Sequence, residues 1–168
     1  MAPGVPTPVH DELHRVDVTG IIWRKDEDGK YRYLITKRAP HKKAWPGKWT
    51  VPGGGVHVHD YVNGEATYQN DESPQWYNAI EKALRRECLE EVGVEVDSVQ
   101  YLLDVAFIGP DGIPRLVLSY FCRYVRGEIA LDDSATEHAW VTAEEASSYD
   151  LIQGIDHEIL EVEKRLSN

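Results

Sequence analysis

The sequence is poor in cysteine, in basic residues and in long hydrophobic runs, and each shortage excludes a class of protein. Only two of its 168 residues are cysteine, so a disulfide framework is excluded and we expect a reduced, cytoplasmic protein. No apolar run is long enough to span a bilayer. Eighteen Lys and Arg against 29 Asp and Glu give a formal net charge of −11, which argues against nucleic acid polymers and anionic membranes as partners.

The remaining composition is that of one folded domain. Hydrophobic residues make up 42% and charged residues 28%, which is typical of a globular chain rather than a disordered one. The beginning, MAPGVPTPVH, lacks the basic and apolar regions of a signal peptide. We therefore expect residues 1–12 to form a mobile, proline-rich tail and residues 13–168 to form a single domain.

The charge is unevenly distributed along the chain. Residues 127–168 hold eleven acidic and two basic residues, or −9 of the total of −11. Residues 37–48 hold no acidic residue and five basic ones, namely Lys37, Arg38, Lys42, Lys43 and Lys48. Proline and glycine at positions 40, 46 and 47 indicate a loop. This basic loop is either an anion-binding element or a solubilising surface.

Strand and helix patterns alternate along the chain. Runs rich in β-branched and aromatic residues predict strands at 16–25, 31–37, 48–51, 94–108, 115–125 and 137–141. Helical patterns cover 75–92, a short segment that begins at the possible N-cap Thr142, and 151–166. Ser73 is a possible N-cap for the first helix, and Glu145 is placed to complete a capping box with Thr142. This order predicts an α/β fold in which helices pack on a sheet.

Two irregular segments precede the first long helix. Three consecutive glycines, Gly53 to Gly55, follow a short strand and allow a ligand to approach the backbone closely. Residues 56–74 are polar and irregular, which predicts a long loop or insertion.

The helix at 75–92 carries acidic residues on the side that should pack. At about 100° per residue, Glu91 falls between Ile80 and Leu84, and Glu87 and Glu90 share that face through three- and four-residue spacings. Like charges that are partly desolvated repel one another unless their pKa values rise or a cation neutralises them. A divalent cation such as Mg²⁺ suits carboxylates that also face phosphates. The alternative is a solvated acidic stripe.

The segment Arg86-Glu87-Cys88-Leu89-Glu90-Glu91-Val92-Gly93-Val94 resembles the second half of the Nudix box, R-E-U-x-E-E-x-G-U, in which U is bulky and apolar. Val51-Pro52-Gly53-Gly54-Gly55 resembles the strand and glycines that open that box. The resemblance to Nudix (MutT-like) hydrolases implies an α/β/α sandwich with a mixed β-sheet. It also implies hydrolysis of a nucleoside diphosphate linked to another moiety, with Mg²⁺ or Mn²⁺ as cofactor.

The spacing departs from the family pattern. In the family a glutamate stands six residues after the glycine, and the arginine follows eight residues later. Here Gly54 and Arg86 are thirty-two positions apart, so the box carries about eighteen extra residues. Counting back eight positions from Arg86 leads to Asn78. In the family this first glutamate often supports the arginine, and Glu65, Glu72 or Glu81 could replace it.

The resemblance implies a role for each box residue. Glu87, Glu90 and Glu91 match the metal-binding glutamates, and the backbone carbonyl of Gly53 matches a further ligand. Arg86 would orient a carboxylate, most simply that of Glu90. The general base that activates the attacking water is either Glu87 or Glu137, because Nudix enzymes differ on this point.

Substrate contacts are expected outside the box. Arg38 and Lys48 of the basic loop are candidate phosphate ligands, and Trp49 is a candidate for stacking on a base. A homodimer is possible, because Nudix domains commonly dimerise. The sequence leaves nucleoside triphosphates, sugar nucleotides, ADP-ribose and dinucleotides open as substrates.

Two other functions remain as alternatives. The segment 38–49 also resembles isopentenyl diphosphate isomerase, a Nudix relative, but that enzyme needs a cysteine where this chain has glycines. A non-catalytic Nudix-like module that binds a nucleotide and regulates a partner is the second alternative. The intact box glutamates argue against it.

Overall fold

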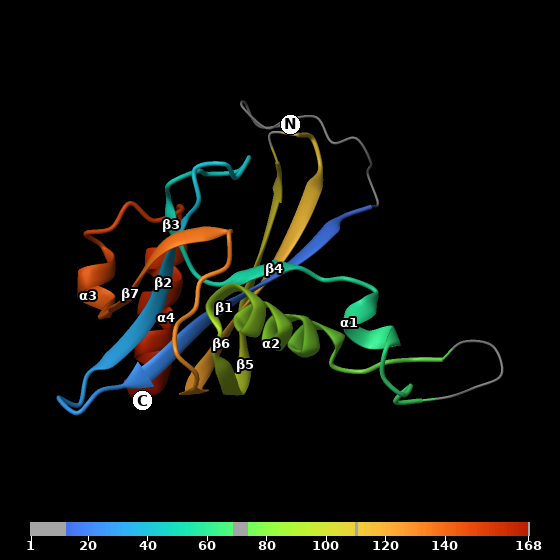
Figure 1. Ribbon diagram of the computed structural model, residues 1–168, viewed down its shortest axis with the longest axis horizontal. Helices are drawn as coiled ribbons and strands as arrows, with labels where there is room; N and C mark the ends of the chain where they lie inside the picture. Colours follow the sequence, from blue (N-terminus) through green and yellow to red (C-terminus); the bar gives the residue numbers. More distant parts are fainter. Residues whose placement is uncertain (1–12, 69–73, 110, 168) are drawn as a thin grey trace.

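The protein folds around one mixed sheet, described here from a computed structural model for residues 13–68, 74–109 and 111–167 (Figure 1). Its strand order is β3-β2-β1-β6-β5, while β4 pairs with β1 and β7 pairs with β2. The strands are β1 (Arg15–Lys25), β2 (Tyr31–Arg38), β3 (Trp49–Thr50), β4 (Gly53–Gly55), β5 (Glu95–Ile108), β6 (Pro114–Arg126) and β7 (Ala135–Val141). The helices are α1 (His59–Val62), α2 (Ala79–Val92), α3 (Ala143–Ala146) and α4 (Ile155–Ser167).

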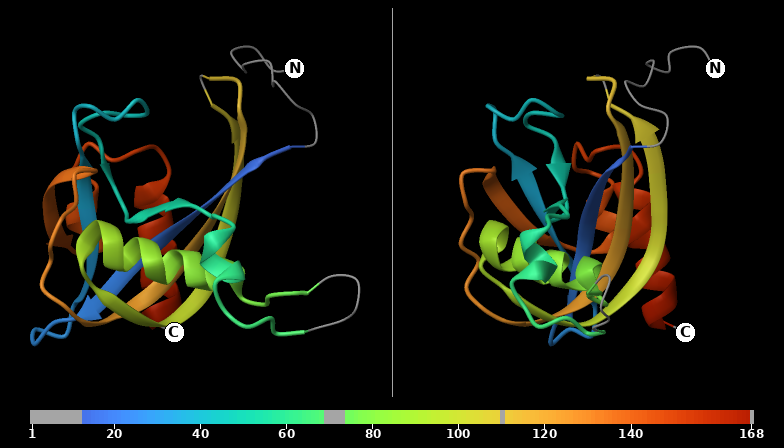
Figure 2. Two further views of the ribbon diagram at one scale, coloured as in Figure 1. Left: turned by 45° about the vertical axis from the view of Figure 1, so that its right-hand side comes forward. Right: turned by 90° about the vertical axis from the view of Figure 1, so that its right-hand side faces the viewer.

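Helices α2 and α4 cover opposite faces of the sheet, which confirms the predicted α/β/α sandwich (Figure 2). Side chains alternate between the two faces of a strand, so consecutive residues of β1 enter different cores. Ile21 packs in the cluster that contains Ile159 of α4, whereas Ile22 packs in the cluster that contains Leu84 and Cys88 of α2. Cys88 is fully buried, in agreement with its position in an apolar slot of the box.

The sheet divides in the middle because β1 changes its partner. The end of β1, from Trp23 to Lys25, pairs with β2, whereas its earlier part pairs with β4. Parallel pairing with β6 continues along β1 from Arg15 to Trp23. Figure 1 shows the consequence, because β2 and the β5–β6 pair diverge on the side where β4 crosses between them.

The glycine triplet is a strand rather than the predicted loop. Gly53 to Gly55 pair antiparallel with residues Thr19 to Asp17 of β1. A Cβ atom on Gly53 would lie 2.2 Å from the carbonyl oxygen of Val18, and the φ of Gly53 is +154°. Only glycine fits there, and the short strand brings the opening of the box against the centre of the sheet.

The long helix begins four residues later than predicted. Gln75 forms an antiparallel bridge with Tyr68, and Asn78 adopts a left-handed conformation with φ of 58°, so helical geometry starts only at Ala79. The predicted N-cap, Ser73, lies outside the described residues and is not the residue before the helix. The helix ends as predicted, because the Gly93 N–H donates to the carbonyl oxygens of Cys88 and Leu89 in the last turn.

The predicted capping box at the third helix is present. The Thr142 side chain accepts a hydrogen bond from the N–H of Glu145, and the Glu145 carboxylate accepts one from the N–H of Thr142. The segment 56–74, predicted to be irregular, contains the single turn α1. No helix in the described part of the chain is long and apolar enough to cross a membrane.

Replacing Tyr33 by phenylalanine is expected to lower the melting temperature, by an amount equivalent to about 1 kcal/mol of unfolding free energy. The hydroxyl of this fully buried tyrosine donates to Glu163 of α4, and burial raises the pKa of Tyr33 far above its ordinary value. Thermal unfolding followed by circular dichroism measures the effect. Tyr31→Phe removes a hydroxyl that donates to the carbonyl of Leu166, close to the end of the chain, and it should lower the melting temperature less. Equal losses in both variants would contradict the prediction.

Candidate active site

Arg86 of α2 is the centre of a carboxylate cluster. Its Nη1 lies 2.8 Å from Oε1 of Glu87 and 2.8 Å from Oε2 of Glu90. Its Nη2 donates to the carbonyl oxygen of Gly55 at 3.0 Å, and its Nε donates to Asp60. The predicted contact with Glu90 is therefore present, but Arg86 also joins α1 and β4 to α2. The surrounding acids raise the pKa of Arg86, with the hydrogen bond to Asp60 as the largest cause.

Asp60 supports Arg86, a role that was expected of a glutamate. Its side chain has no exposed surface, and it accepts hydrogen bonds from Arg86 and from the His57 N–H. Burial by itself would raise the pKa of Asp60, but these hydrogen bonds and the charge of Arg86 hold it below its ordinary value.

Of the three predicted substitutes for the first box glutamate, Glu65 and Glu81 were wrong, and the structure does not test Glu72. Glu65 is exposed, Glu81 pairs with Arg85, and Glu72 lies outside the described residues. Asp60 stands six positions after Gly54, which is the family spacing counted forward from the glycine. Counting back from Arg86 failed because the extra residues lie between Asp60 and Arg86.

Glu87 is buried beneath the glycine strand with 7% of its surface exposed. A Cβ atom on Gly54 would lie 2.5 Å from Oε1 of Glu87, so a glycine is needed for the carboxylate to occupy this place. Burial raises the pKa of Glu87, and the hydrogen bond and charge of Arg86 oppose that change.

Glu91 is bound to the first glycine of the same strand. Its Oε2 accepts a hydrogen bond of 2.8 Å from the Gly53 N–H, and Oε1 lies 3.4 Å from the Ser134 hydroxyl. Burial raises the pKa of Glu91 to about 7, and the Gly53 N–H is the largest opposing effect. The charges of Glu87 and Asp132 raise it further.

The donor set of this cluster fits a hard divalent cation. Three carboxylates (Asp60, Glu87 and Glu90) contact the Arg86 guanidinium, Glu91 stands on the same helix against Gly53, and burial opposes ionisation of both Glu87 and Glu91. A bound cation would offset this excess of negative charge with oxygen ligands. Glu90 is 58% exposed and turns toward Arg86. Across the part of the chain that the structure describes, no three metal-ligating side chains converge on one point, so the metal roles of the glutamates and of Gly53 stay predictions.

The basic residues of the loop have different partners. Lys48 forms an ion pair with Asp150, and Lys37 lies 2.7 Å from Glu137. Arg38 is half-buried and donates to the Ala44 carbonyl; burial lowers its pKa, and the nearby charge of Glu91 opposes that change. Arg38 therefore lies near Glu91 of the box, whereas Lys48 is paired with Asp150.

The aromatic residues of the loop have different surroundings. Trp49 packs against Tyr149 with ring centroids 4.9 Å apart and belongs to the core on the α4 side. Trp45 has a φ of 47°, is partly exposed, and its ring meets that of Phe107 on β5 at 5.9 Å. The loop thus contacts β5 through Trp45, on the side where the sheet diverges.

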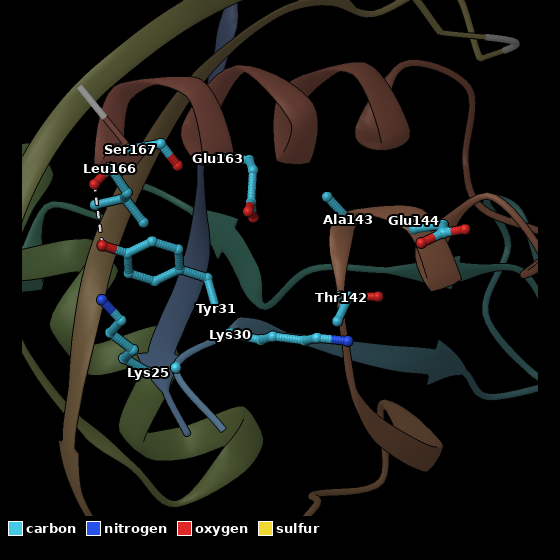
Figure 3. A pocket seen from close by; sticks show the side chains of 10 residues that line it. Lys25, Lys30, Tyr31, Thr142, Ala143, Glu144, Glu163, Leu166 and Ser167 are labelled. Atoms are coloured by element: carbon cyan, nitrogen blue, oxygen red, sulfur yellow. Dashed lines mark hydrogen bonds between the residues drawn. The ribbon is translucent and has the colours of Figure 1, made fainter. Parts of the chain in front are cut away.

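A separate cavity of about 700 Å³ lies between the β1–β2 turn and the end of α4 (Figure 3). Lys25, Tyr31 and Glu163 are among its lining residues, and Figure 3 shows the Tyr31 hydroxyl bonded to the Leu166 carbonyl. None of the box residues lines this cavity, so it is distinct from the candidate active site.

Comparison with known proteins agrees with this architecture. The sequence profile of the NUDIX domain matches residues 13–162, and the chain therefore belongs to the NUDIX domain family. The predicted resemblance is confirmed.

Particular relatives support the same assignment. The nucleoside triphosphatase NudI of Klebsiella pneumoniae is 28% identical over 130 residues, which cover 71% of this chain and 79% of the relative. The same enzyme of Salmonella typhimurium is 29% identical with the same coverage. This agrees with the predicted enzyme class, a hydrolase of phosphoric anhydrides.

Solved structures share the fold at low sequence identity. The NUDIX domain of Shewanella oneidensis NrtR, complexed with ADP ribose, has a TM-score of 0.68 and 16% identity, with 94% of each chain covered. The MutT protein of Methanosarcina mazei has a TM-score of 0.63 and 20% identity, covering 95% of this chain and 99% of that one.

Proposed function

We propose that this protein is a divalent-metal-dependent pyrophosphohydrolase that cleaves a nucleoside diphosphate linked to another moiety. The observation that carries the proposal is that buried Glu87, which contacts Arg86, and half-buried Glu91 both lie against the glycines of β4. Arg38 of the basic loop lies close enough to Glu91 for the two charges to interact. Anionic metal ligands and a cationic group for phosphate therefore adjoin one another.

Glu87, Glu90, Glu91 and the Gly53 carbonyl would hold Mg²⁺ or Mn²⁺. When bound, such a cation offsets charge on phosphate oxygens and makes water a better nucleophile. Arg86 holds the carboxylates of Glu87 and Glu90 in place, and Arg38 offsets phosphate charge. Glu87, which is buried and has a raised pKa, is suited to accept a proton from the attacking water.

The proposed function is tested by measuring turnover of a panel of nucleoside triphosphates, sugar nucleotides, ADP-ribose and dinucleotides with MgCl₂. For nucleoside triphosphates, inorganic pyrophosphatase converts the product pyrophosphate to phosphate; for the other compounds, phosphatase releases phosphate from the product. The phosphate is then measured colorimetrically. The wild type should hydrolyse at least one compound, EDTA should abolish the activity, and Glu91→Gln should reduce it by about 10²-fold or more. Glu95→Gln, at an exposed ion pair with Arg126, is the matched control and should behave as wild type.

Three outcomes would count against the proposal. Activity that survives EDTA, or equal activity in the wild type and Glu91→Gln, would exclude the metal role. Calorimetric binding of a nucleotide without turnover would favour the non-catalytic module instead. The isomerase alternative is not supported, because both cysteines are buried in the core and glycines stand where that enzyme needs a cysteine.

A further inference from the structure

The loop between β6 and β7 packs on the end of α2 that carries Glu91. In this loop the Asp132 N–H donates to the carbonyl oxygen of Glu91 at 3.2 Å, and the Ser134 N–H donates to the Asp132 carboxylate at 2.8 Å. The Ser134 hydroxyl lies 3.4 Å from Oε1 of Glu91. The loop therefore contacts both the backbone and the side chain of one box glutamate.

The first turn of the basic loop is joined to the same place. The Ala39 N–H donates to the Ser134 carbonyl oxygen at 2.8 Å, and the Lys42 N–H donates to the Ala39 carbonyl oxygen at 3.1 Å. Two hydrogen bonds thus connect the backbone of half-buried Lys42 to the residue beside the Glu91 carboxylate. Burial raises the pKa of Glu91, and the positive charge of Lys42 is among the effects that oppose this change. The Lys42 side chain is therefore within electrostatic reach of the box.

The basic loop is also fixed beyond Lys42. Nε of Arg38 donates to the Ala44 carbonyl oxygen at 2.9 Å, which ties the start of the loop to its later part. The next residue, Trp45, packs its ring against Phe107 on β5. A backbone that is already ordered loses less conformational entropy when a ligand binds. Lys42 is therefore carried on a segment that is held in place on both sides.

The other lysines of the basic loop are less suited to bind a ligand at the box. Lys37 and Lys48 each form an ion pair with an acidic side chain of a neighbouring segment. Lys43 follows Lys42 in the chain but is exposed. Within the residues that the structure describes, Lys42 forms no ion pair, so its ammonium group is available to an anion.

We propose that Lys42 is a phosphate-binding residue of the candidate active site, beside Arg38, and that its ammonium group offsets charge on the phosphate chain of the substrate. The inference rests on the proposed function in taking a phosphate-bearing ligand at the box. A lysine ammonium group acts on phosphate as a compact point charge with three hydrogen-bond donors. If Lys42 only balanced the charge of Glu91, its loss would not weaken phosphate binding.

Calorimetric titration with imidodiphosphate, a pyrophosphate analogue with a nitrogen bridge, tests the inference in MnCl₂ without requiring turnover of a nucleotide. Lys42→Gln should raise the dissociation constant about tenfold, the scale of one lost charge-assisted hydrogen bond. Lys42→Arg keeps the charge and should stay within about threefold of the wild type. Lys43→Gln removes the same charge from the exposed neighbouring position and should stay within about twofold.

Binding of Mn²⁺ alone, measured by electron paramagnetic resonance, is the second readout. Lys42→Gln should bind Mn²⁺ at least as tightly as the wild type, because the loss of a nearby positive charge does not weaken a cation site. This measurement also shows whether the variant retains its fold around the box.

The results separate this inference from the proposed function. Equal imidodiphosphate binding in the wild type and Lys42→Gln, equal weakening in Lys42→Gln and Lys43→Gln, or a wild type that does not bind the analogue overturns the inference. Weaker Mn²⁺ binding in Lys42→Gln also overturns it, because the loss would then lie in the metal site. Binding without turnover of any nucleotide removes only the proposed hydrolysis, whereas turnover with unaltered binding in Lys42→Gln removes only the role of Lys42.

Discussion

Replacing Glu87 by glutamine is expected to lower kcat/KM for the best nucleotide substrate by about 10³-fold, within the range typical of a lost general base. Glutamine has nearly the same volume, so it can occupy the space beneath Gly54, but it has neither the negative charge nor the basicity of a carboxylate. Steady-state kinetics at saturating MgCl₂ measures the effect, and thermal unfolding shows whether the fold is retained.

Glu137→Gln is the matched comparison, because both residues are candidates for the general base. Glu137 is more than half exposed and is paired with Lys37 on the neighbouring strand β2. We expect a loss of less than about tenfold for this variant, which is far smaller than the effect of losing a general base. A larger loss for Glu137→Gln than for Glu87→Gln would reverse the assignment.

Replacing Asp60 by asparagine is expected to destabilise the fold by about 3 kcal/mol, the scale of breaking a buried ion pair. Asp60 has no exposed side-chain surface, and its carboxylate holds Arg86 against Gly55. Without that charge, Arg86 loses the partner that fixes its position beside Glu87 and Glu90. We therefore expect kcat to fall as well, since Asp60 acts as a positioning residue.

The stabilisation by Asp60 should depend on pH. The pKa of Asp60 lies below its ordinary value of about 3.9 in the folded protein. Its contribution is therefore complete above that value and is lost as the pH falls through the folded-state pKa. Urea unfolding at pH 7 and at pH 3 should show a large difference between wild type and Asp60→Asn at pH 7, and a smaller one at pH 3.

Asp60→Glu is the informative control for this position. It restores the residue type of the family pattern and keeps the charge, so activity should stay closer to wild type than in Asp60→Asn. Identical urea midpoints for wild type and Asp60→Asn at pH 7 would show that the contact with Arg86 contributes nothing to stability.

Local regularities in the sequence were sufficient to predict most elements. The pairing of Thr142 with Glu145 depends on residues three positions apart, and the end of α2 depends on Gly93. The shared face of Glu87, Glu90 and Glu91 follows from helical geometry, and so does the contact of Arg86 with Glu90. In each case the interacting groups belong to one turn of one element, so sequence spacing fixes their distance.

Contacts between residues that are distant in the sequence could not be predicted from the sequence. Asp60 contacts Arg86 across twenty-six positions, and the length of the chain between them does not fix which acid arrives there. The glycine triplet became a strand because β1 offers it a pairing edge. Helix α2 begins later than predicted because Gln75 pairs with Tyr68, and helix propensity does not describe such a contact.

The sequence by itself therefore determined the fold class, the family resemblance and the acidic residues of the box, because these depend on composition and on short spacings. Only the tertiary structure decided which acid holds Arg86 and which basic residues are already paired. Those relations arise when strands and helices distant in the chain pack together. Their geometry depends on sheet pairing and on burial, which have no fixed counterpart in sequence separation.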